Sequence, residues 1–119
     1  MSSIWEITRT ALVGLNIPLA ANRYLAPTGQ QLPDQYIIYQ VISSPPELSA
    51  DNAEKYRSYR MQVTIWDRSG LAQLPDIAAA MVAAGFGRGP FRELPYVEST
   101  RHYGFAMDFF YLEDELIQI

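Results

Sequence analysis

His102 is the only histidine of the chain and the first candidate for chemistry, because an imidazole can act as an acid, a base or a metal ligand. Ser69, Ser99 and Thr100 could supply a nucleophile, but His102 is their only evident base partner. The chain has no Cys and no second His, which excludes a thiol nucleophile and the usual zinc sites. We therefore expect His102 to be a solvated or hydrogen-bonding residue, and we expect no catalytic residue and no enzyme.

Two further patterns could bind ions. The glycine-rich run Gly85–Pro90 is similar to a phosphate loop, but such a loop precedes a helix N-terminus, and this run follows an expected helix. It is interpreted as a helix end and a loop. Glu113, Asp114 and Glu115 could bind a hard cation, but neighbouring residues of a strand point to opposite faces. A solvated acidic end is favoured, and neither a metal nor a cofactor is expected.

Length and charge limit the class of protein. The 119 residues suit one domain, residues 1–119, and the charged fraction of 18% is below the usual value of about 25%. A rather apolar surface is expected, which could form an interface. The net charge is -4 and the cations are scattered, so direct nucleic-acid readout is not expected. No apolar stretch is long enough for a membrane span, and no signal-peptide pattern occurs, so no membrane partner is expected.

The N-terminal third predicts one helix and one strand. Ser3 and Glu6 stand at capping-box spacing before a helical repeat of apolar residues, and Gly14–Asn16 supplies stop signals. Residues 17–35 contain three prolines and indicate an irregular connection. Tyr36–Ile42 is rich in β-branched and aromatic residues and predicts a strand.

A long loop and an alternating strand are expected next. The polar segment from Ser43 through Lys55 contains two adjacent prolines, which cannot sit inside a sheet. The following strand, Tyr56 to Trp66, alternates cleanly. Tyr59, Met61, Val63 and Ile65 share one face, and Arg60, Gln62, Thr64 and Trp66 share the other.

The C-terminal half predicts a helix and a last strand. A turn at Asp67–Gly70 leads to a helix from about Leu71 to Ala84, starting near Leu74 with Pro75 as its first helical residue. A short strand at Phe91–Val97 and a strand from Tyr103 to about Leu112 follow.

Asp108 lies inside this last, aromatic strand. It is interpreted as a residue of the wet face or as a partner of Arg60 across strands.

The expected fold is α+β, a small mainly antiparallel sheet with two helices packed on one face. The residues predicted to be buried between sheet and helices are Met61, Val63, Ile65, Phe105, Met107 and Phe109. Trp66 and Phe110 fall on the polar sides of their strands, where exposed aromatic residues favour protein contacts. Base stacking on RNA is the rival interpretation, and the negative charge argues against it.

The order of features over about residues 4–113 resembles that of the small tail-completion proteins of long-tailed bacteriophages, the tail-to-head joining and tail-terminator group. The pieces that carry the resemblance are Gln31–Pro33, Tyr36–Val41, Tyr59–Asp67, Ile77–Met81, Gly85-Phe86 and Tyr103–Phe109. The C-terminal extension Glu115–Ile119 is not part of the matched pattern.

The resemblance implies a structural protein that terminates the tail tube, forms a ring, commonly a hexamer, and joins tail to head. Its implied partners are further copies of itself, the tail tube protein and the head connector protein. Its implied place is the virion tail, assembled in the cytoplasm of the bacterial host. The alternative is a non-phage cytosolic adaptor or ligand-binding module with an aromatic sheet face.

Two segments are expected to make the intersubunit contacts. The stretch from Ser44 to Arg57 exceeds ordinary hairpin lengths, and Glu113 to Ile119 combines acidic and apolar residues. The expected interface residues are Pro45, Pro46, Glu47, Asp51, Glu54, Lys55, Arg57, Trp66, Phe110, Glu113, Asp114, Glu115, Leu116, Ile117 and Ile119.

Overall fold

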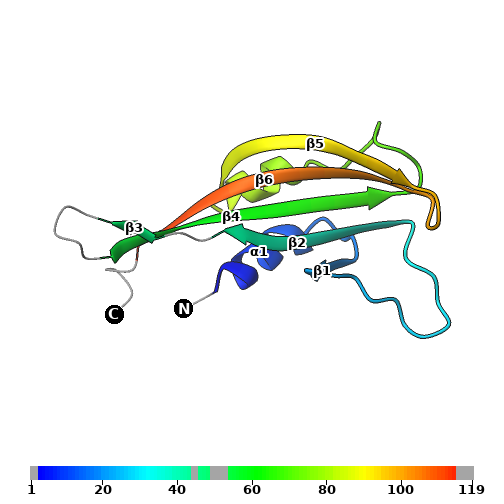
Figure 1. The fold of residues 1–119 in the computed structure, drawn as a ribbon, viewed down its shortest axis with the longest axis horizontal. Coiled ribbons are helices and arrows are strands. Elements are labelled where there is room, and N and C mark those ends of the chain that lie inside the picture. The colour runs from blue at the N-terminus through cyan, green and yellow to red at the C-terminus, as the bar shows by residue number, and fades with distance from the viewer. Residues whose placement is uncertain (1–2, 44–45, 49–53, 115–119) are drawn as a thin grey trace.

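A computed structural model describes residues 3–43, 46–48 and 54–114, with side chains described for residues 3–42 and 58–112 (Figure 1). Within this part of the chain, two helices accompany one sheet of six strands. The elements are α1 (Ile4–Val13), β1 (Leu19–Ala21), β2 (Gln35–Ser43), β3 (Pro46–Leu48), β4 (Glu54–Asp67), α2 (Ile77–Ala83), β5 (Gly87–Val97) and β6 (His102–Asp114).

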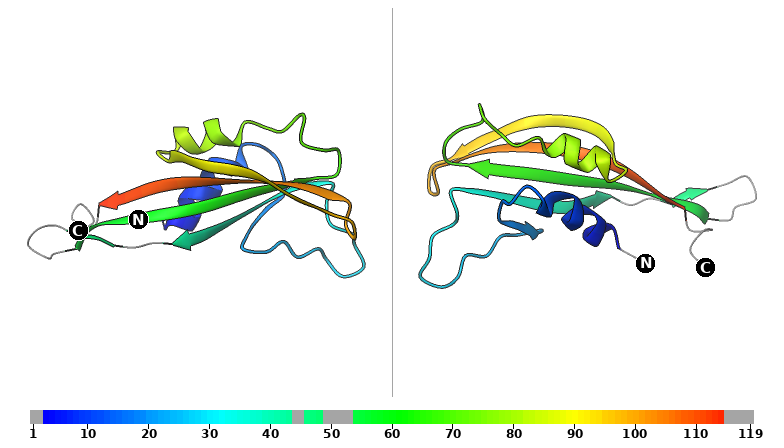
Figure 2. Two further views of the ribbon diagram at one scale, coloured as in Figure 1. Left: turned by 45° about the horizontal axis from the view of Figure 1, so that its top comes forward. Right: turned by 180° about the vertical axis from the view of Figure 1, so that it is seen from behind.

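The sheet has the strand order β1-β2-β4-β6-β5, and β3 pairs with the outer part of β4. Every pairing is antiparallel except the short parallel contact between β1 and β2. Figure 2 shows both helices against the same side of the sheet, where they contribute to one core. The predicted α+β fold, with two helices on one face of a mainly antiparallel sheet, is confirmed.

Both helices have defined caps. The Ser3 hydroxyl accepts a hydrogen bond from the Glu6 amide at 3.2 Å, as the capping-box spacing predicts. In α2, the Asp76 carboxylate accepts from the Ala79 amide at 3.0 Å, so Asp76 is the N-cap. The predicted start near Leu74, with Pro75 inside the helix, is therefore wrong, because the helix begins at Ile77, directly after its N-cap Asp76.

The end of α2 follows the predicted glycine signal. Gly85 adopts φ 101°, and its amide donates to the Val82 carbonyl at 3.0 Å. The next amide, of Phe86, donates to the Met81 carbonyl at 3.1 Å, which completes a Schellman motif. The glycine-rich run therefore ends a helix and opens β5, and it does not face a helix N-terminus.

Three strands were not predicted at their observed extents. The connection expected to be irregular contains β1, and β5 spans Gly87–Val97, where a short strand at Phe91–Val97 was expected. β5 accommodates Pro90 and Pro95 because it is an edge strand whose register shifts near both prolines. Pro46 likewise belongs to the edge strand β3, so the prediction of one continuous loop from Ser43 through Lys55 is wrong.

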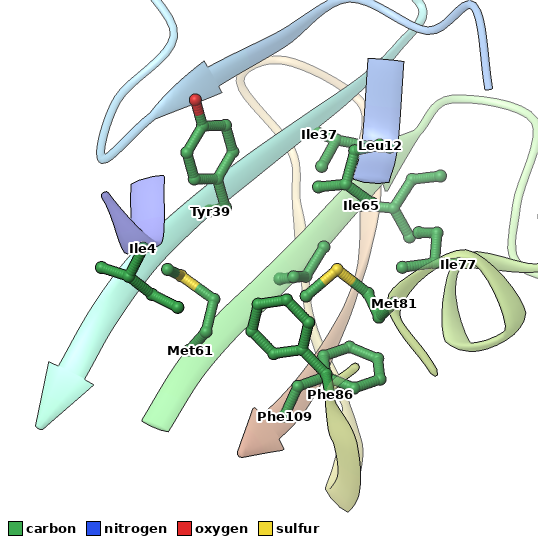
Figure 3. Close-up of a cluster of buried hydrophobic side chains, with 11 residues drawn as sticks. Ile4, Leu12, Ile37, Tyr39, Met61, Ile65, Ile77, Met81, Phe86 and Phe109 are labelled. Atoms are coloured by element: carbon green, nitrogen blue, oxygen red, sulfur yellow. The ribbon is translucent and has the colours of Figure 1, made fainter. Parts of the chain in front are cut away.

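The core lies between the sheet and the helices (Figure 3). Met61, Val63 and Ile65 of β4 are fully buried, as alternation predicts. The other buried residues of this cluster are Ile4, Leu12, Ile37, Tyr39, Ile77, Met81, Phe86 and Phe109.

Two of the predicted core residues are only half-buried. Phe105 and Met107 share the core face but remain partly exposed, because α2 has only seven residues and leaves the sheet uncovered beside β5.

Candidate assembly surface

One end of the sheet projects beyond the helices. β4 has 14 residues, which corresponds to about 46 Å of strand, and the molecule measures 52 × 28 × 23 Å. Figure 1 shows β3 and the neighbouring ends of β4 and β6 extending past both helices. We call this extension the arm: β3, residues 54–58 of β4 and residues 112–114 of β6. The radius of gyration is 16.1 Å, whereas a compact chain of this length has about 13.5 Å.

The arm brings together the two segments that were predicted to contact other subunits. The backbone of Arg57 lies between Pro46 of β3 and Glu113 of β6, and that of the preceding residue, Tyr56, lies between Glu47 and Asp114. Predicted interface residues whose backbone lies in the arm are Pro46, Glu47, Glu54, Lys55, Arg57, Glu113 and Asp114. Those outside the described residues are Pro45, Asp51, Glu115, Leu116, Ile117 and Ile119. Their role at an interface stays a prediction.

The arm also carries an open strand edge. The pairing of β5 with β6 reaches Phe110 and, within the described residues, goes no further along β6. Leu112, just beyond that point, is 59% exposed, and Phe110 is 40% exposed. An open backbone edge that carries apolar side chains is a ready template for pairing with another chain.

Trp66 and Phe110 do not form one aromatic patch. In the register of β4 and β6, Trp66 lies opposite Gly104 and Phe110 lies opposite Arg60, which separates the two rings by about 20 Å along the sheet. Phe110 is exposed as predicted, whereas Trp66 is half-buried. The indole lies over Gly104, where the missing side chain leaves room for it.

Replacing Gly104 with Ala is expected to lower the free energy of unfolding by about 1–3 kcal/mol through overpacking. A Cβ at this position would lie 2.5 Å from Cζ3 and 2.8 Å from Cε3 of Trp66, so the indole must move. Urea denaturation followed by tryptophan fluorescence measures the loss. Gly14→Ala is the control, because Gly14 has φ -67° and nothing within 4 Å of an added Cβ. Equal stabilities of the two variants would contradict the packing of Trp66 on Gly104.

A polar network lies on the sheet face opposite the helices. Arg60 donates through Nε to Asp108 Oδ2 at 2.9 Å and also through Nη2, and its guanidinium lies 5.8 Å from the centre of the Phe110 ring. Gln62 donates to Asp108 Oδ1 at 3.4 Å and accepts from Gln40 at 3.2 Å. Asp108 is 2% exposed, so its placement on the wet face is wrong, whereas its pairing with Arg60 is confirmed.

Gln40 was not singled out from the sequence. It joins the network only because β2 and β4 pair with Gln40 directly opposite Gln62.

His102 is buried at the start of β6. Its Nε2 donates to the Pro33 carbonyl at 2.9 Å, and its ring makes an edge contact with Tyr36. The prediction of a hydrogen-bonding residue is confirmed, and that of a solvated one is wrong. The hydrogen bond goes to the backbone and not to Ser69, Ser99 or Thr100.

Tyr36, whose ring makes the edge contact with His102, is also buried. Burial raises the pKa of the Tyr36 hydroxyl, while the charge of Arg68 acts in the opposite direction.

A polar cavity of about 640 Å³ lies beside the β5–β6 turn. Arg68 lines this cavity. Its guanidinium donates to the carbonyls of Thr100 at 2.8 Å and Leu32 at 3.1 Å, and to the Asp34 carboxylate at 2.7 Å. These bonds tie the connector before β2 to the β5–β6 turn, so we assign Arg68 a structural role.

Among the described residues, no cluster of three His, Asp or Glu side chains could hold a metal ion.

Comparison with protein-family models finds no match, and no curated protein matches the chain. None of the helices in the described part of the chain is long and apolar enough to cross a membrane. The fold and the surface together define an α+β domain with a projecting sheet arm.

Proposed function

We propose that this protein is a structural subunit that assembles into a ring, terminates a bacteriophage tail tube and joins the tail to the head. The observation that supports this proposal best is the arm. It extends the sheet beyond the helices and offers an open edge of β6 with an exposed Leu112.

The physical argument concerns the stability of such an extension. A ribbon of two or three strands without a covering layer is marginal by itself in water, and open edges favour pairing with other chains. A subunit with a protruding arm on one side can contact a different surface of its neighbour. Head-to-tail contacts of this kind close into rings when the rotation between subunits permits.

The phage assignment rests on the order of features described for the sequence. The observed elements keep that order, with a short N-terminal helix, a central pair of strands, an alanine-rich helix and an aromatic last strand. In this role the chain carries no catalytic residue, and its buried His102 and Asp108 stabilise the fold.

The alternative is an adaptor or ligand-binding module that uses an aromatic sheet face. The face that carries Trp66 and Phe110 is occupied between them by the network of Arg60, Gln62 and Asp108. This arrangement favours the assembly proposal over a continuous aromatic binding face.

A test compares two exposed leucines of similar accessibility. Leu112→Arg places a charge on the arm, and Leu25→Arg places the same charge on the connector, where Leu25 is 71% exposed. Each variant is supplied to a phage that lacks the wild-type protein, and electron microscopy counts capped tails and joined particles. We expect Leu112→Arg to lower the joined fraction at least about tenfold, the equivalent of about 1.4 kcal/mol of contact energy.

The control is expected to join heads and tails like the wild type. Tails made without any copy of the protein should be headless and irregular in length. Normal tails in its absence would contradict the proposed function, and normal joining by Leu112→Arg would contradict the role of the arm.

A further inference from the structure

An apolar groove lies on the helix side of the sheet, between α2 and β5. It has a volume of about 290 Å³, and the residues that line it include Ala78, Arg88, Phe91, Phe105, Met107 and Phe109. Phe91 is 71% exposed although its ring contacts Phe105 at 5.5 Å between centroids. The groove exists because the short α2 leaves this part of the sheet uncovered.

The groove has a direction set by charge. Arg88 lies opposite Phe109 at one end, and Glu93 lies opposite Phe105 at the other. Both side chains are exposed, and neither forms an ion pair with another described residue. An acidic group therefore fits the Arg88 end, and apolar groups fit the part of the groove that is lined by Met107 and Phe105.

The C-terminal residues 115–119 have the matching pattern. In an extended chain Glu115, Ile117 and Ile119 point to the same side, because side chains alternate with a period of two. Phe109, Met107 and Phe105 have the same two-residue spacing along β6. If Glu115 meets Arg88, Ile117 and Ile119 come to lie beside Met107 and Phe105.

We propose that residues 115–119 of a second copy of this chain occupy the groove, with Glu115 on Arg88 and with Ile117 and Ile119 on Met107 and Phe105. The inserted segment would run antiparallel to β6. This contact rests on the self-association in the proposed function and supplies its head-to-tail geometry, with residues 115–119 of one subunit in the groove of the next.

The length of the chain argues for a second copy. Asp114, the last described residue, lies about 17 Å along β6 from Phe109. Reversing the chain takes at least two residues, so residues 117–119 could return by only about 10 Å. Ile119 would then stop short of Phe109, and Ile117 would remain farther away. The segment therefore cannot fill the groove of its own subunit.

The absence of Cys from the chain permits a direct test by disulfide trapping of the full-length protein. Ile117→Cys is mixed with Ala78→Cys, whose side chain lines the groove, and the mixture is oxidised. The matched control is Ile117→Cys mixed with Ala83→Cys, which is exposed elsewhere on α2. We expect a cross-linked dimer with Ala78→Cys and at least about tenfold less of it with Ala83→Cys.

Charge reversal gives a second readout. Arg88→Glu, which changes an exposed side chain, should lower the cross-link yield about tenfold, and adding Glu115→Arg to the Ile117→Cys partner should restore it.

Equal yields for the two mixtures, or no loss with Arg88→Glu, would overturn the proposal. So would an internal cross-link in a monomer that carries both Ile117→Cys and Ala78→Cys, because the segment would then occupy its own groove. If no cross-link forms but the wild-type protein caps tails normally, only this contact is refuted and the proposed function stands. A specific cross-link in a protein that does not cap tails would refute the phage role and leave the contact in place.

Discussion

Phe109→Ala is expected to lower the free energy of unfolding by about 3–5 kcal/mol, the usual loss for a buried phenylalanine. The Phe109 ring is 2% exposed, stands edge-on to Phe86 at 6.5 Å and lies on β6 opposite Met61 of β4. Truncation would leave a cavity at the point where the sheet and α2 meet. Urea denaturation measures the change as a lower midpoint with an unchanged slope.

Phe105→Ala is the matched control on the same face of the same strand. Phe105 is half-buried and lies in the groove wall, so a smaller loss of about 1–2 kcal/mol is expected from the apolar area that it buries. A loss at Phe105 equal to that at Phe109 would show that α2 covers more of the sheet than the structure indicates.

Arg60→Met is expected to lower the free energy of unfolding by about 3 kcal/mol, because it leaves Asp108 buried without its cationic partner. Asp108 is 2% exposed, whereas the Arg60 side chain is 40% exposed and can be hydrated by itself. Asp108→Asn should therefore cost less, about 1–2 kcal/mol, since the amide can keep part of the hydrogen bonding. Chemical denaturation of both single variants measures this asymmetry.

The double variant completes the test of the pair. Arg60→Met combined with Asp108→Asn should be more stable than the sum of the two losses predicts, because no buried charge is left unpaired. Arg92→Met, an exposed arginine on β5, should change stability by less than about 0.5 kcal/mol. Strictly additive losses would show that Arg60 and Asp108 do not stabilise each other.

Local patterns in the sequence were sufficient for α1, for the end of α2 and for the sides of the central strands. The Ser3 cap and the Gly85 stop depend on backbone groups within a few residues of each other, so local residue types decide them. The burial of Met61, Val63 and Ile65 follows from the two-residue period of a strand. These features need no knowledge of which strands become neighbours.

Which strands pair, and how far the helices cover the sheet, were decided only by the tertiary structure. Alternation placed Asp108 opposite the core, but its burial depends on Arg60 and Gln62 arriving from the neighbouring strand. Two adjacent prolines argued against a strand at β3, but the edge strands β3 and β5 tolerate proline because the missing amide faces no partner.

The candidate assembly surface shows the same division. Composition and length marked residues 44–57 and 113–119 as unusual, while only the pairing of β3 and β6 with β4 placed Pro46 and Glu113 on either side of Arg57. Likewise, the sequence determined the apolar side chains at Phe91 and Phe105, but the extent of α2 decided that a groove stays open between them. The physical reason is that side-chain period is a local property, whereas register and coverage depend on contacts between residues far apart in the chain.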